Sequence, residues 1–204
     1  MSDWDSVRAD LGDKVVDALV AAVTGAREDL NVYRATLPTF AYEHSGRGLA
    51  GWIHDRMWAH LQRELFDLPG VDLHESGPTR EVTVGLNYRL RFKRHNASGA
   101  IRNYRTPTAL AFWEQDEFAL PGLAETRLCF GYVWDGETEQ IGDPVISRRS
   151  DQDKVLWVVR LDEDASGGAG GADVEPLVPP TTPGLPSIIT PTTQSDNQDG
   201  TDTP

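Results

Sequence analysis

The chain has 204 residues, of which 19 are Lys or Arg and 32 are Asp or Glu, so its formal net charge is −13. That charge disfavours nonspecific nucleic-acid binding, although it leaves room for a local basic patch. The first residues lack a basic region followed by an apolar one, and no apolar run approaches membrane-spanning length, so we expect a cytoplasmic protein without a membrane segment. Arg outnumbers Lys sixteen to three, which indicates a GC-rich bacterial or phage genome.

Composition divides the chain into a domain of residues 1–164 and a tail of residues 165–204. All aromatic residues lie in the domain, whereas the tail has no Lys or Arg and holds seven of the 13 prolines. An acidic segment rich in Gly, Pro and Thr buries too little apolar surface to offset the entropy of ordering, so we predict a disordered tail. Its apolar island "PGLPSIITP" is interpreted either as a docking motif for a protein partner, through Leu185, Ile188 and Ile189, or as a linker without a partner.

Two amphipathic helices are predicted in the first third of the chain. Over residues 3–24 apolar side chains recur at spacings of three and four, and Gly25 offers a stop. A second helix is predicted from an N-cap at Ser45 to the residues before Pro69. Between them, residues 28–42 predict only a short helix.

Beyond Gly70 the hydrophobic period changes from 3.6 to 2, which predicts strands. Two of them, residues 71–75 and 80–93, flank a turn and predict a hairpin. Further strands are predicted near residues 101–105, 109–113, 127–134, 145–149 and 155–161. Asp135-Gly136 is a hairpin signal between two of these. Helices followed by strands predict an α+β fold, in which two main N-terminal helices pack on one face of a five- to six-stranded, mostly antiparallel sheet.

A basic strip, "NYRLRFKRHN", occupies residues 87–96. Strand alternation places Arg89, Arg91 and Lys93 on one face, at intervals of about 6.6–6.8 Å, which is near the spacing of phosphates in an extended nucleic acid. No acidic residue lies between Glu81 and Glu114. The candidate surface for nucleic acid or another anion therefore comprises Asn87, Arg89, Arg91, Lys93, Arg94, His95, Arg102 and Arg105.

A second interpretation of the strip stays open, because charged strand faces are often solvated or paired with acidic side chains. The nearest acidic cluster in the sequence comprises Glu114, Asp116 and Glu117. If this cluster lay across the sheet from Arg89 and Arg91, the strip would be an internal ion-pair network, which argues against a polyanion partner. The acidic tail could also compete for the strip and so weaken nonspecific binding.

No motif predicts a catalytic residue, a metal site or a cofactor. Metal-ligand spacing is missing among the histidines, which are His44, His54, His60, His74 and His95. An acid–acid–lysine nuclease would depend on Lys93, whose strand has no acid beside it. The single cysteine, Cys129, lies in an apolar run and is interpreted as a buried packing thiol.

The segment "LCFGYVWDGETEQIGDPVISRRSDQDKVLWVVRL" has a turn entry made by Gly131, Tyr132, Val133 and Asp135, and a closing strand that contains Trp157. Over residues 48–161 the chain resembles small uncharacterised bacterial and prophage proteins associated with genes for helix-turn-helix repressors and their metallopeptidase partners. The resemblance implies an accessory or regulatory role and transfers no catalytic residue.

The sequence therefore predicts a non-catalytic regulatory or accessory protein of bacterial or phage origin, which binds DNA, RNA or another anionic partner through the basic strand. Two alternatives remain. One is a toxin–antitoxin or repressor-associated module whose protein contact surface is apolar and helical. The other is a metal-dependent nuclease. The oligomeric state is not indicated.

Overall fold

A computed structural model describes residues 3–77, 79–101, 106–113, 125–150 and 154–161. The helices are α1 (Trp4–Leu11), α2 (Asp13–Thr36), α3 (Pro38–Tyr42), α4 (Gly46–Glu64) and α5 (Pro107–Trp113). The strands are β1 (Val71–Ser76), β2 (Thr79–Val84), β3 (Tyr88–His95), β4 (Thr126–Asp135), β5 (Gln140–Arg149) and β6 (Val155–Arg160).

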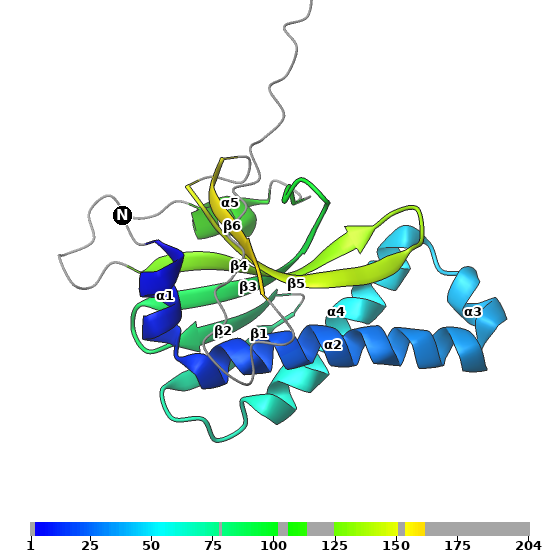
Figure 1. Cartoon of the computed structure of the whole chain (residues 1–204), viewed down its shortest axis with the longest axis horizontal. Helices are drawn as coiled ribbons and strands as arrows, with labels where there is room; N and C mark the ends of the chain where they lie inside the picture. The colour runs from blue at the N-terminus through cyan, green and yellow to red at the C-terminus, as the bar shows by residue number, and fades with distance from the viewer. Residues whose placement is uncertain (1–2, 78, 102–105, 114–124, 151–153, 162–204) are drawn as a thin grey trace, which may run out of the picture.

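The six strands form one sheet in sequence order, with the N-terminal helices on one face and α5 on the other (Figure 1). Every neighbouring pair is antiparallel except β3 and β4, which are parallel. The main apolar core lies between the helices and the sheet, and a small cluster lies under α5. The predicted α+β arrangement of two main helices on a mostly antiparallel sheet is confirmed. None of the described helices is long and apolar enough to cross a membrane.

The first predicted helix is broken at Gly12, so the prediction of one helix over residues 3–24 is wrong. Gly12 has φ +80°, a left-handed conformation that an L side chain rarely adopts, and it separates α1 from α2. The break lets α1 lie against the sheet edge, where the rings of Trp4 and Trp157 meet edge-on at 5.9 Å. Asp3 caps α1 by accepting a hydrogen bond from the Ser6 amide at 3.0 Å.

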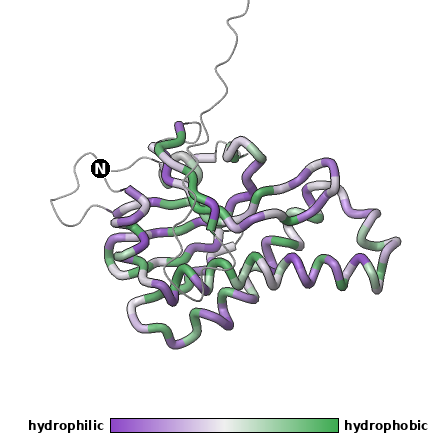
Figure 2. Tube along the Cα trace, viewed as in Figure 1, coloured by the Kyte–Doolittle hydropathy of each residue, from purple (hydrophilic) through white to green (hydrophobic). Residues whose placement is uncertain are grey.

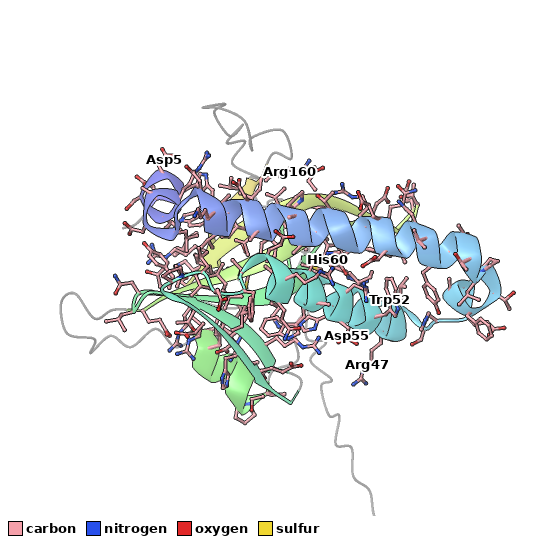
Figure 3. The ribbon with its side chains drawn as sticks, turned by 90° about the horizontal axis from the view of Figure 1, so that it is seen from below. Asp5, Arg47, Trp52, Asp55, His60 and Arg160 are labelled. Atoms are coloured by element: carbon pink, nitrogen blue, oxygen red, sulfur yellow. The ribbon has the colours of Figure 1, made fainter. Side chains whose placement is uncertain are left out.

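Helix α2 runs through Gly25, which the sequence predicted as its stop. At this position α2 packs closely on α4, and a Cβ atom at Gly25 would overlap the imidazole ring of His60. Glycine is therefore used here for close packing inside the helix and not as a stop. Figure 3 shows His60 between the two helices. The predicted start of α4 is confirmed, since the Ser45 hydroxyl oxygen accepts a hydrogen bond from the Gly48 amide at 3.1 Å.

Gly25→Ala and Gly51→Ala are expected to change stability in opposite directions. Both glycines lie inside helices, where Ala is favoured over Gly by about 1 kcal/mol. A Cβ atom at Gly51 meets nothing within 4 Å, so that variant should gain about this amount. At Gly25 the added methyl displaces the His60 ring, which costs about 1–3 kcal/mol. Urea denaturation followed by circular dichroism measures both, and an equal gain in both variants would contradict the close packing.

The strand predicted over residues 80–93 is two strands, β2 and β3, joined by a turn. Gly85 has φ +58° and its amide donates to the Gly70 carbonyl at 2.7 Å. The turn preserves the predicted alternation because Val84 pairs with Tyr88. Val82, Val84, Tyr88, Leu90 and Phe92 therefore share one face and are all buried, whereas Leu86 lies in the turn and is 82% exposed.

The strand predicted over residues 109–113 is the helix α5. Pro107 begins this helix, a position that suits its fixed φ and missing N–H, and the Thr106 hydroxyl accepts from the Ala109 amide at 3.2 Å. Of the strand predicted over residues 101–105, only Ile101 is described, and it bridges to His95. The strands predicted for β4, β5 and β6, with the hairpin at Asp135, are confirmed.

Hydrophobic and hydrophilic residues alternate along α2 and along the strands (Figure 2). In α2 the buried side chains run from Val15 to Leu30. The helix then continues for six residues to Thr36, which is about one and two-thirds turns beyond its last buried residue. This overhang carries α3 at its end (Figure 1).

Candidate functional site

Three of the predicted binding residues, Arg89, Arg91 and Lys93, lie on one face of β3, as alternation required. Their face is the one that α5 covers, and Phe112 of α5 packs on it. The guanidinium carbon of Arg91 lies 4.1 Å from the centre of the Phe112 ring, a distance at which a cation and an aromatic face attract each other. The face is therefore partly covered by the protein's own helix.

Ion pairs hold these arginines in a network that we call the charged layer, formed by Glu81, Arg89, Arg91, Glu125 and Arg127. Glu81 is only 5% exposed, and its two carboxylate oxygens accept from Arg91 at 2.5 Å and from Arg89 at 3.2 Å. Glu125 accepts from Arg89 at 2.8 Å and from Arg127 at 3.0 Å. Three guanidinium groups thus share two carboxylates, so the network keeps a net charge of +1, and each of its arginines is already paired with a carboxylate.

Lys93 and His95 lie in environments that disfavour a positive charge. Burial lowers the pKa of the Lys93 ammonium and lowers the pKa of His95 to about 3, because a low-dielectric environment disfavours the charged form. His95 is fully buried. Its Nδ1 lies 3.1 Å from the Lys93 carbonyl oxygen, so Nδ1 carries the proton, and its Nε2 lies 3.0 Å from the Ser147 hydroxyl. The ring is a neutral structural group.

The remaining predicted residues lie elsewhere. Asn87 belongs to the β2–β3 turn, where its carbonyl accepts from the Thr126 amide at 2.6 Å. Arg94 lies on the helix face of β3, with its guanidinium carbon 5.4 Å from the centre of the Trp134 ring. Arg102 and Arg105 lie outside the described residues, as do the acidic cluster of residues 114–117 and the whole tail.

Sequence reasoning missed two polar residues beneath α5, Ser147 and Arg149. Both are buried, and the Arg149 guanidinium donates to the Gly99 carbonyl. Alternation along β5 places them on one face, but the sequence does not show that α5 covers that face. Cys129 is buried beside them, as predicted, and burial raises the pKa of its thiol to about 12, so the thiol stays protonated at neutral pH.

A second candidate surface is apolar and helical, and we call it the α2–α3 tip. It consists of Val32, Leu37, Phe40 and Tyr42, whose exposed fractions range from 45% to 71%. These are four of the six exposed large apolar residues in the described part of the chain, and they fall within 11 consecutive residues. Of the other two, Phe66 follows the end of α4 and Leu86 lies in the β2–β3 turn.

The base of the tip is held by an aromatic contact between α2 and α4. The rings of Tyr33 and Trp52 stack at 5.0 Å with an interplanar angle of 18°, and the Tyr33 hydroxyl lies 3.0 Å from Nε2 of His44. Figure 3 shows Trp52 on the part of α4 nearest the tip. The tip is therefore anchored at its base, although α2 buries no side chain beyond Leu30.

His60 makes structural contacts. Its Nε2 lies 2.7 Å from Asp29 and its Nδ1 lies 2.6 Å from the Arg63 guanidinium, while Asp29 also accepts from Arg56 at 2.8 Å. Among the described residues no three His, Cys, Asp or Glu side chains are arranged to bind a metal ion.

No protein-family model, curated protein or solved structure matches the chain. The resemblance to prophage proteins therefore stays an expectation.

Proposed function

We propose that the protein is a non-catalytic regulatory or accessory module that binds another protein through the α2–α3 tip. The observation that carries the proposal is the concentration of exposed large apolar side chains in residues 32–42. Apolar surface in water is unfavourable, and a cluster of it on a folded domain marks an interaction site more often than scattered single residues do.

The overhang of α2 supports the same proposal. Beyond Leu30 the helix buries no side chain fully in the core of its own domain, and helix formation in proteins depends mainly on packing of an apolar face. A partner protein that covers Val32, Leu37 and Phe40 would supply that packing. This is the apolar, helical contact surface expected of a toxin–antitoxin or repressor-associated module.

Binding of nucleic acid by the basic strand stays a prediction, and the charged layer argues against it. A phosphate that approached Arg91 would have to displace Glu81, whose carboxylate is already within 2.5 Å. It would also compete with Phe112 for the guanidinium face. The nuclease alternative likewise stays a prediction and has no described cluster of ligands in its favour.

Photo-crosslinking tests the proposed function. A benzoylphenylalanine placed at Phe40 of the full chain in the source cells should give a discrete, protease-sensitive adduct on irradiation. Phe66 is the matched control, because it is the same residue type and is 75% exposed against 61% for Phe40. The same substitution at Phe66 should not give this adduct.

The protein identified in the adduct is then purified and titrated against the full chain by calorimetry. Phe40→Asp should weaken binding at least about 30-fold, as loss of a central aromatic contact does, whereas Phe66→Asp should change it less than about two-fold. Equal effects of the two variants, or an adduct that nuclease removes, would contradict binding of a protein at the tip.

A further inference from the structure

We infer that residues 185–189 of the same chain dock on the α2–α3 tip and compete there with the partner protein. The inference rests on the proposed function, because it takes the tip to be a binding surface. It names a second occupant, the apolar island of the tail, and it gives that island a regulatory role.

The composition of the island fits the tip. Residues 183–191 carry no charge, and their large side chains are the aliphatic Leu185, Ile188 and Ile189. The tip offers two aliphatic and two aromatic side chains. The tail has no aromatic residue, Lys or Arg, and residues 185–189 hold three of its four Leu and Ile side chains.

The fold places Leu161, the last described residue before the tail, within reach of the tip. Leu161 donates its amide to the Pro144 carbonyl of β5 at 2.9 Å. From Pro144, β5 leads back to Glu139, whose carboxylate lies 3.8 Å from Arg34 of α2. Five residues of antiparallel strand span about 17 Å, so Leu161 lies on the order of that distance from the last turn of α2.

The length of the intervening chain matches this span. If residues 162–184 behave as the flexible coil that their composition predicts, their root-mean-square reach is about 24–29 Å. Adding about one helical turn from Arg34 to the centre of the tip gives a span of similar size. A linker whose reach matches the span gives the highest effective concentration, of millimolar order. An affinity as weak as about 1 mM would therefore keep the tip occupied about half of the time.

Competition follows from this occupancy. A partner that binds only the uncovered tip has an apparent dissociation constant equal to its intrinsic dissociation constant divided by the fraction of the tip that stays uncovered. Half-occupancy therefore weakens partner binding about two-fold, and nine-tenths occupancy weakens it about ten-fold. Removing the apolar side chains of the island should restore the full affinity.

Paramagnetic relaxation enhancement in the full chain tests the docking. Cys129 is buried, so a spin label can be attached selectively to Ser195→Cys, just beyond the island. The label should broaden the NMR signals of Val32 and Phe40 much more than those of Phe66 and Leu86. Leu185→Ser, Ile188→Ser and Ile189→Ser, combined in the labelled chain, should remove the difference. Uniform broadening, or stronger broadening at Phe66 and Leu86, would overturn the inference.

The two proposals fail separately in these experiments. In one outcome, the label broadens the tip signals selectively, but Phe40 gives no protein adduct in the native chain or in the triple serine variant. This outcome would leave the docking intact and contradict the proposed function. In the other outcome, Phe40 gives a protein adduct, the partner binds the native and triple serine chains with equal affinity, and the broadening is not selective. This outcome would leave the proposed function intact and contradict the docking.

Discussion

Replacing Glu81 with Gln is expected to lower the free energy of unfolding by about 3–5 kcal/mol, because it breaks a buried ion pair from one side. Glu81 is 5% exposed, and the side chain of its partner Arg91 is 14% exposed. The neutral amide leaves the Arg91 charge under α5 without the Glu81 carboxylate, while Arg89 keeps Glu125 at 2.8 Å. Guanidinium denaturation monitored by tryptophan fluorescence measures the loss.

Asp143→Asn is the matched control for this experiment. Asp143 pairs with Arg160 at 3.1 Å, but both side chains are about half exposed, so the change should be below about 1 kcal/mol. A loss of that size for Glu81→Gln as well would mean that the charged layer is solvated. Fluorescent DNA and RNA titrated at low salt into the Glu81→Gln protein provide a second readout. Tight, salt-sensitive binding there would revive the nucleic-acid prediction.

Gly131→Ala is expected to destabilise the fold by about 3 kcal/mol and to lower Tm by about 6–12 °C, the range for a domain of this size. Gly131 pairs with Lys93 in the parallel junction of β3 and β4. A Cβ atom there would overlap the Lys93 carbonyl oxygen, and a backbone atom fixed in a sheet cannot rotate away as the end of a side chain can. Differential scanning calorimetry measures the shift.

Gly136→Ala serves as the comparison, because a Cβ atom at Gly136 in the β4–β5 turn meets nothing within 4 Å. Its Tm should stay within about 2 °C of the parent protein, as a surface substitution usually does. If Gly131→Ala behaves in the same way, β3 and β4 do not approach each other as closely as described. The close approach also gives a physical reason for the glycine in the Gly-Tyr-Val turn entry.

The helices were predictable because their apolar spacing is strong, but their ends depended on tertiary contacts. Gly12 and Gly25 look alike in the sequence, since both interrupt the same periodic pattern. Gly12 ends α1 through its positive φ, whereas Gly25 stays helical and accommodates His60. A single sequence shows that each glycine lacks a side chain, and it does not show which use the fold makes of that property.

Strand prediction failed where a short apolar run was ambiguous. Residues 109–113 suit a strand or a helix equally by length and composition, and the helix is favoured by Pro107 at its first position. The turn at Gly85 was also missed. A three-residue turn that pairs Val84 with Tyr88 leaves the two-residue alternation intact on both sides, so the hydrophobic pattern carries no trace of it.

The arginine face of the charged layer could be predicted from the sequence, but the partner Glu81 could not, because of the missed turn at Gly85. Alternation placed Arg89, Arg91 and Lys93 together correctly. Their partner Glu81 was overlooked because it bounded the acid-free segment, and a continuous strand would have carried it about ten residues away from Arg91. The turn brings Glu81 directly opposite Arg91. An apolar, helical contact surface was one of the alternatives, but the residues of the α2–α3 tip were not predicted, because helical periodicity does not show where the core beneath a helix ends.

The parallel junction between β3 and β4 has a consequence for how the chain folds. It joins two antiparallel meanders, β1 to β3 and β4 to β6, each of which is built from strands that are neighbours in sequence. Each meander closes only short loops, whereas Tyr88 meets Thr126 only after the long connection between β3 and β4 has closed. The entropy cost of closing a long loop arises before the non-local strand pairing contributes any stability. We therefore expect the two halves of the sheet to form early and their joining to limit the rate of folding.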